Sequence, residues 1–72
     1  MKPYTSPDSS IIGYDYWTDW ISVQFQDWKI YTYTYQSARA ENIEEMKRLA
    51  DQNDWLNSFI MTHVKKNYAK IS

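Results

Sequence analysis

The sequence predicts a small α+β domain in which a three-stranded antiparallel sheet, a meander, is followed by two helices packed on one face. Three observations predict this fold. Apolar and polar residues alternate in the first half, apolar residues recur about every 3.6 positions in the second half, and turn residues separate the segments. A chain of 72 residues is one domain. Since it has no cysteine and 18% of its residues are aromatic, we expect aromatic side chains to supply much of the core.

The strands are predicted in order along the first half. Residues 1–10 are rich in Pro, Ser and Thr, so we expect a disordered or extended lead-in before a single domain over 11–71. An apolar and aromatic segment, 11–17, predicts the first strand. Residues 20–26 alternate strictly between apolar and polar, which is typical of a half-buried strand. The third strand is predicted over 29–35, which is rich in Tyr, Thr and Ile.

Two helices are predicted after the sheet. Asn42 and Glu45 have the spacing of a capping box, so we expect the first helix to begin at Asn42. The second helix is predicted from 54 to 69, with Asp54 as its N-cap and its apolar residues on one face. One strand face and the helical stripes together give the predicted core, which is Ile21, Val23, Phe25, Leu49, Leu56, Phe59 and Ile60.

The register of the second hairpin decides which face carries the tyrosines of the third strand. These tyrosines are Tyr31, Tyr33 and Tyr35. A two-residue loop, 27–28, pairs Phe25 with Ile30. The three tyrosines then lie on the face opposite Ile21, Val23 and Phe25 and form an exposed aromatic platform. A three-residue loop, 27–29, pairs Phe25 with Tyr31 and puts them in the core. The second register is favoured because so short a chain needs the larger core.

Several short motifs fall at spacings that resemble the KTSC domain family, named for a domain at the C-terminus of some lysyl-tRNA synthetases. They are Gly13-Tyr14-Asp15, the alternating Ile21, Val23 and Phe25, then Tyr31 and Tyr33, and later Ala50, Trp55-Leu56-Asn57 and Ile60. The resemblance touches most of the chain and implies the fold of that family. It also implies RNA binding, which has been proposed for the family from the synthetase context. Two features depart from the family: Trp28 stands where a Gly is usual, and the Val-Pro after the Tyr-x-Tyr is missing.

The residue types give poor support for catalysis. The chain has one histidine and no cysteine, so a Ser-His-Asp or Cys-His system is not expected. On a helical wheel His63 falls within the apolar stripe, where we expect it to pack. Asp15, Asp19 and Asp27 fall in predicted turns, in which Asp caps the local backbone. We therefore expect no enzyme, no catalytic or metal-binding residue and no cofactor.

Binding is the function that the sequence predicts. The leading hypothesis is a module that binds a protein partner, or a second copy of itself as a homodimer, through an aromatic sheet face turned away from the helices. The alternative is RNA or single-stranded nucleic acid held by aromatics and the C-terminal lysines. The net charge of −1 argues mildly against this alternative. The candidate binding residues are Trp20, Trp28, Tyr31, Tyr33, Tyr35, Lys65, Lys66 and Lys70.

Two further expectations concern these lysines and the location of the protein. On the helical wheel Lys65 points away from Lys66 and Lys70. No apolar run reaches the roughly 18 residues of a membrane span, and the first residues lack the apolar stretch of a signal peptide. We therefore expect a cytoplasmic protein with no membrane partner and no small-molecule cofactor.

Overall fold

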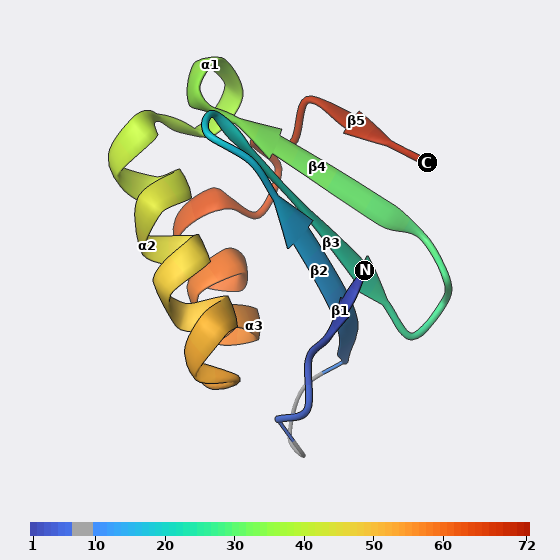
Figure 1. Ribbon diagram of the computed structural model, residues 1–72. Helices are drawn as coiled ribbons and strands as arrows, with labels where there is room; N and C mark the ends of the chain where they lie inside the picture. Colours follow the sequence, from blue (N-terminus) through green and yellow to red (C-terminus); the bar gives the residue numbers. More distant parts are fainter. Residues whose placement is uncertain (7–9) are drawn as a thin grey trace.

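The computed structural model describes residues 1–6 and 10–72. Its strands form one antiparallel sheet in the order β1-β2-β3-β4-β5, and the helices lie on one side of that sheet (Figure 1). The strands are β1 (Lys2–Pro3), β2 (Ile11–Tyr16), β3 (Trp20–Phe25), β4 (Ile30–Thr34) and β5 (Lys70–Ile71). The helices are α1 (Tyr35–Ala38), α2 (Ala40–Gln52), α3 (Leu56–Phe59) and the π-helix η1 (Ile60–Val64). The predicted α+β class with an antiparallel sheet is confirmed.

The prediction of three strands is wrong, because each end of the described chain adds a short edge strand. β1 pairs with β2 through Lys2 and Pro3, and β5 pairs with β4 through Lys70 and Ile71. Gly13 makes room for β1, since a Cβ there would stand 3.2 Å from the carbonyl oxygen of Lys2. Strands of two residues are too short for an alternating pattern to reveal them.

The predicted lead-in, residues 1–10, includes a residue of the core. Tyr4, which follows β1, is only 5% exposed, and its hydroxyl accepts a hydrogen bond from the backbone N–H of Leu56 (3.1 Å). This bond ties the start of the chain to the start of α3. Residues 7–9, which belong to the same predicted segment, lie outside the described residues.

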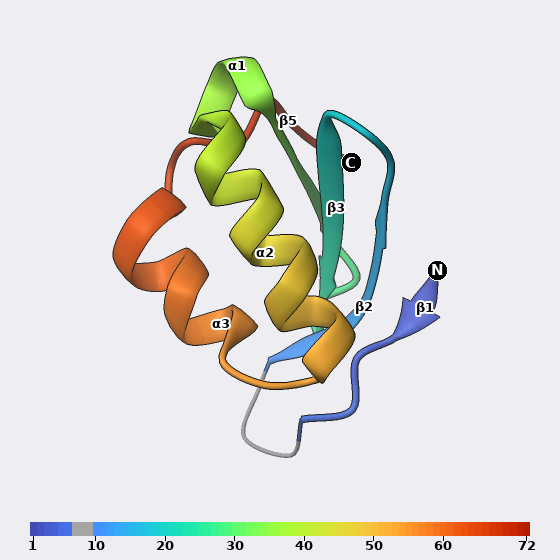
Figure 2. The same cartoon turned by 60° about the vertical axis from the view of Figure 1, so that its left-hand side comes forward.

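The core lies between the sheet and the helices. Figure 2 shows α2 and α3 side by side over one face of the strands. The most deeply buried large side chains come from both layers; they are Tyr33, Ile21, Ile43, Met46, Leu56, Ile60, Val23 and Val64. Five predicted core residues are buried, whereas Phe25 and Phe59 pack against the core and stay partly exposed. Burial of this apolar surface drives the two layers together.

The hairpin between β3 and β4 has a register that neither sequence alternative predicts. Its loop is residues 26–28, because the N–H of Phe25 donates to the carbonyl of Lys29 (3.0 Å). Val23 then faces Tyr31, and Ile21 faces Tyr33. This register differs from the favoured one by two residues. An even shift leaves the side chains on the same face, so the core-facing position of the β4 tyrosines is confirmed.

The helix boundaries correct the sequence prediction. α2 begins at Ala40, and its N-cap, Arg39, makes no side-chain cap. Asn42 does not cap the helix, since its amide donates to the carbonyl of Ala38 (2.8 Å). The capping box lies earlier, at the start of α1, where Thr34 and Ser37 bond reciprocally. The predicted helix over 54–69 is helical only from Leu56 to Val64, after which the chain turns and adds β5 to the sheet.

Candidate ligand-binding site

A pocket of about 440 Å³ opens between the β3–β4 hairpin and the segment that leaves η1. Its volume falls within the range of about 300–1,000 Å³ that is usual for small-ligand sites. The lining residues come from segments far apart in the sequence; they are Ser10, Phe25, Asp27, Tyr31, Tyr33, Met61, Lys65, Lys66 and Tyr68. We call it the tyrosine pocket.

The aromatic walls of the tyrosine pocket hold one another in fixed orientations. The ring of Tyr31 stands edge-to-face with Phe25 (centroids 5.3 Å apart) and with Tyr68 (5.2 Å). Tyr68 also meets Tyr33 edge-to-face at 6.4 Å. Such perpendicular pairs are favoured by the charge distribution of aromatic rings. The wall is therefore ordered before any ligand arrives, which lowers the entropic cost of binding.

The hydroxyl groups of the tyrosines divide into two classes. The four tyrosines outside the pocket all have hydrogen-bonded hydroxyls; they are Tyr4, Tyr14, Tyr16 and Tyr35. Within residues 1–6 and 10–72, the hydroxyls of Tyr31, Tyr33 and Tyr68 make no hydrogen bond. Burial raises the pKa of Tyr33 to about 12, so its hydroxyl stays protonated at neutral pH. Three phenolic groups are therefore available to a ligand, each as a donor or an acceptor.

Charged groups stand at the rim. Lys65 and Lys66 are exposed there, and neither forms an ion pair with a described residue. Asp27 also lines the pocket, and its carboxylate accepts a hydrogen bond from the N–H of Lys29 (3.0 Å). Two ammonium groups are thus free to meet an anion beside an aromatic surface.

The structure brings four predicted site residues together in this pocket: Tyr31, Tyr33, Lys65 and Lys66. The helical wheel wrongly separates the two lysines. It assumes a regular α-helix, whereas the chain passes through the π-helix η1 and then leaves the helix at Lys65. Tyr68 and Asp27 also line the pocket, but the sequence pattern did not indicate Tyr68 as a site residue and placed Asp27 only in a turn. A basic pair with an aromatic residue two positions after it is the signal that could have pointed to Tyr68.

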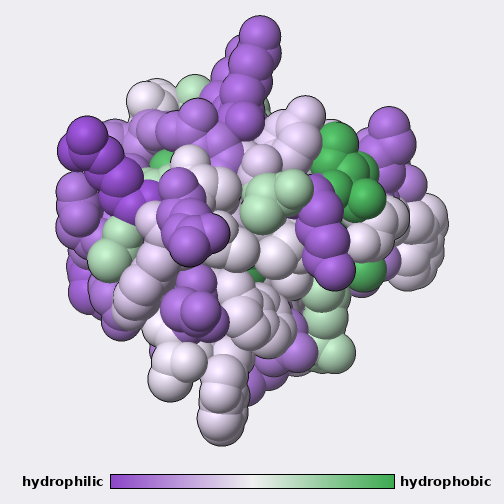
Figure 3. Space-filling model, turned by 90° about the horizontal axis from the view of Figure 1, so that it is seen from above, coloured by the Kyte–Doolittle hydropathy of each residue, from purple (hydrophilic) through white to green (hydrophobic). Residues whose placement is uncertain are grey.

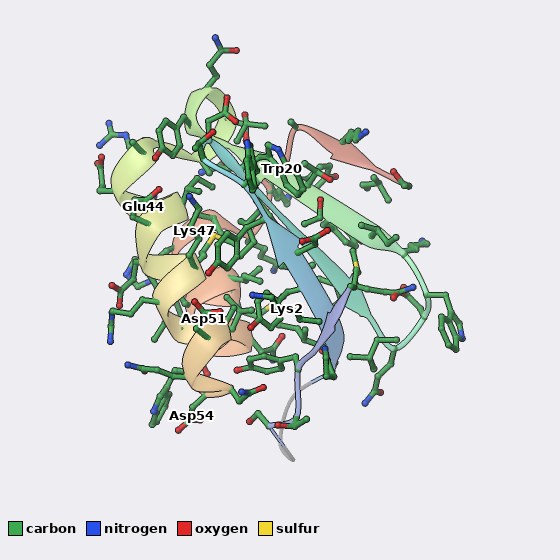
Figure 4. All side chains as sticks on the ribbon, viewed as in Figure 1. Lys2, Trp20, Glu44, Lys47, Asp51 and Asp54 are labelled. Carbon is green, nitrogen blue, oxygen red and sulfur yellow. The ribbon has the colours of Figure 1, made fainter. Side chains whose placement is uncertain are left out.

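The other four candidates lie elsewhere. Trp20, labelled in Figure 4, and Lys70 line a hollow of about 260 Å³ on the face of the sheet away from the helices. Ser22 and Thr32 form part of that hollow, and their hydroxyl oxygens lie 2.7 Å apart. Trp28 is 73% exposed at the tip of the hairpin.

Tyr35 and His63 also depart from their predicted places. Tyr35 has left the strand to begin α1, where its hydroxyl donates to the carboxylate of Glu44. His63 is exposed instead of packed inside, and its ring stacks on Phe59 with the centroids 4.3 Å apart. Neither residue lines the tyrosine pocket.

The surface at the α1 and β5 end is a mixture of hydrophilic residues and residues of intermediate hydropathy (Figure 3). Seen from that end, its apolar patches are small and separate (Figure 3). No helix among the described residues is long and apolar enough to cross a membrane. Within the same part of the chain, no group of three or more His, Cys, Asp or Glu is arranged to hold a metal ion.

Comparison with known proteins finds no matching family model, no matching curated protein and no matching solved structure, so membership of the KTSC family stays a prediction.

Proposed function

We propose that this protein is a non-enzymatic binding module that holds single-stranded nucleic acid in the tyrosine pocket. One observation carries the proposal: aromatic walls, three phenolic hydroxyls and two lysines that have no partner among the described residues converge in one pocket of ligand size. An unpaired base has a flat π surface, polar edges and an adjacent phosphate. Each of these parts has a matching group in the pocket.

Different polar groups of the pocket contact different parts of the ligand. The hydroxyls of Tyr31, Tyr33 and Tyr68 bond the edge of the base, because these residues line the pocket and their hydroxyls have no hydrogen-bond partner among the described residues. The ammonium groups of Lys65 and Lys66 take the phosphate, because they stand at the rim. Contact between a base and aromatic side chains is worth about 1–3 kcal/mol per base.

The low net charge of the protein limits the electrostatic contribution to the binding of nucleic acid. With eight basic and nine acidic residues, the protein has no general attraction for a polyanion. Two lysines at the rim imply about two phosphate contacts. For single strands, the logarithm of the affinity then falls with the logarithm of the salt concentration with a slope of about −1.4.

A salt titration tests the proposal. A fluorescent single-stranded RNA of mixed sequence is titrated between about 50 and 200 mM salt, and the slope should fall to about −0.7 for Lys65→Gln and for Lys66→Gln. Lys70→Gln is the matched control, because Lys70 lies on the other face of the sheet and should keep the wild-type slope. Absence of binding at the lowest salt, or equal slopes for all four proteins, refutes the proposal.

Self-association through the open sheet face is the second candidate. Trp20 and Ile30 give this face half-buried apolar surface beside a hollow, and none of the helices in the described part of the chain covers it (Figure 1). Apolar side chains with polar neighbours are typical of interfaces. Sedimentation equilibrium tests this: the wild type should gain mass with concentration, and Trp20→Ser should remain a monomer. A wild type that is monomeric throughout excludes the homodimer.

A further inference from the structure

The tip of the β3–β4 hairpin carries a tryptophan on an unfavourable backbone. Trp28 has φ = 70°, in the left-handed region that favours Gly or Asn, and 73% of it is exposed. Non-glycine residues in such conformations cluster at functional sites. Asp27, the preceding residue, lines the tyrosine pocket. The strained residue is therefore next to the proposed site.

The fold itself gives no reason for an indole at this position. The turn is held by backbone atoms of Trp28: its N–H donates to Phe25 (2.9 Å), and its carbonyl accepts from the amide of Gln24 (3.3 Å). Among the described residues, the indole N–H donates no hydrogen bond and the ring stacks on no other ring. A glycine would make the same turn with less strain.

We infer that Trp28 stacks on a second base of the strand whose neighbouring nucleotide occupies the tyrosine pocket. This inference rests on the proposed function and narrows its ligand to a strand of at least two nucleotides, in place of a free nucleotide. Consecutive Cα atoms are about 3.8 Å apart, close to the roughly 3.4 Å between stacked bases of one strand. Asp27 at the pocket and Trp28 beyond it can therefore meet adjacent nucleotides.

The test compares a single nucleotide with a strand. Adenosine monophosphate and an oligoadenylate of about eight nucleotides, within the usual site size of single-strand binders, are titrated against wild type and Trp28→Gly. Removal of one base stack should weaken strand binding by about 5- to 150-fold. Binding of the mononucleotide should stay unchanged, and the Tm of the variant should be at or above that of wild type. Trp28→Phe, which keeps an aromatic ring, should restore most of the strand affinity.

Trp55→Gly is the matched control. Trp55 also has a left-handed backbone (φ = 67°) and is 66% exposed, but it lines a groove beside Arg48 and His63, away from the tyrosine pocket. Its removal relieves the same kind of strain and should leave strand affinity unchanged. This control separates the loss of a particular stack from the loss of any surface indole.

Each other result overturns the inference. If Trp28→Gly binds the strand as tightly as wild type, Trp28 holds no base, and the proposed function still stands. A lower Tm for Trp28→Gly would show that the indole stabilises the fold. Equal losses of affinity for the strand and for the mononucleotide would show that the indole supports the pocket and does not stack on a second base. If wild type binds neither probe, the proposed function fails together with the inference.

Discussion

Replacing Asp51 by Ala should destabilise the protein strongly, because Asp51 joins α2 to the sheet. Its two carboxylate oxygens each accept a hydrogen bond, from the hydroxyls of Tyr14 (2.8 Å) and Tyr16 (2.7 Å). The two tyrosine rings come from β2 and stack with their centroids 6.2 Å apart. Figure 4 shows Asp51 on the side of α2 that faces the strands. One side chain thus anchors the C-terminal half of α2.

The magnitude follows from what each hydroxyl loses. Tyr14 is 4% exposed as a whole residue, so water would replace the lost bond poorly, and an unpaired buried polar group costs about 1–3 kcal/mol. Tyr16 is partly exposed, so its loss is nearer to the roughly 1 kcal/mol of an ordinary hydrogen bond. Asp51→Ala should therefore lower the free energy of unfolding by about 2–4 kcal/mol, which lowers the Tm of a domain of this size by at least roughly 8 °C.

Acid should remove the same stabilisation from the wild type. The hydrogen bond from Tyr16 is the main cause that lowers the pKa of Asp51 below its ordinary value of 3.8, and the bond from Tyr14 and the charge of Lys2 add to it. A carboxyl with a lower pKa in the folded state stabilises the fold above its unfolded pKa, and this stabilisation is lost as the pH falls through the folded pKa. The difference between wild type and Asp51→Ala should therefore shrink below about pH 4.

Urea unfolding followed by tryptophan fluorescence measures both effects. Wild type and Asp51→Ala are compared near neutral pH and at about pH 3, below the ordinary range of a carboxyl pKa. Tyr16→Phe is the control, since it removes the more exposed bond alone and should cost about 1 kcal/mol. Equal urea midpoints for wild type and Asp51→Ala near neutral pH refute the reasoning. A difference that is unchanged in acid refutes the assigned role of the ionised carboxylate.

Three further predictions concern single side chains. Leu56→Ala should lower the free energy of unfolding by about 2–5 kcal/mol, because Leu56 is fully buried. Phe59 is only partly buried, so Phe59→Ala should lower it by less than the roughly 3–5 kcal/mol of a fully buried Phe. A lower urea midpoint for Phe59→Ala than for Leu56→Ala would contradict this. Tyr33→Phe should leave the Tm nearly unchanged, since the lost hydroxyl has no hydrogen-bond partner among the described residues, while the proposed RNA binding weakens. A large fall in Tm would contradict this. Burial raises the pKa of Tyr14 from 10.0 to about 12, so the stabilisation that the neutral hydroxyl gives below pH 10 should be lost between pH 10 and 12. Thermal unfolding of Tyr14→Phe should lack this part of the loss. Identical profiles of Tm against pH for wild type and Tyr14→Phe would contradict the assignment.

Periodicity predicted the layers of this fold because burial imposes it. The alternation in β3 gave the core face, and the even register shift kept Tyr31 and Tyr33 on that face. Helix boundaries were harder, because cap prediction relies on side chains that bond the first turn. Arg39 and Trp55 precede α2 and α3 without any such bond, and both have a positive φ. No local sequence signal marks a helix that begins in this way.

Four of the candidate residues named from the sequence line the tyrosine pocket, but the sequence did not predict that they lie together. Residue type identified Tyr31, Tyr33 and the lysines, since tyrosine and lysine suit bases and phosphates wherever they lie. Their proximity depends on η1, whose wider turn no regular wheel represents. It also depends on β5, because the chain must turn after Lys66 to reach the edge of the sheet, and Tyr68 enters the pocket on the way.

The three-residue turn of the β3–β4 hairpin therefore determines which face of the sheet carries Tyr31 and Tyr33, and so where the tyrosine pocket forms. A slip of one residue in that hairpin would move Tyr31 and Tyr33 to the open face, beside Trp20 and Lys70, and would take both tyrosines out of the core. The backbone bonds of Trp28 fix the turn, so the register needs the left-handed conformation at this position but not the indole. Glycine would serve the fold as well or better. The presence of tryptophan at the residue that sets the register, next to the pocket that the register creates, is thus the strongest reason to look for a ligand that spans both.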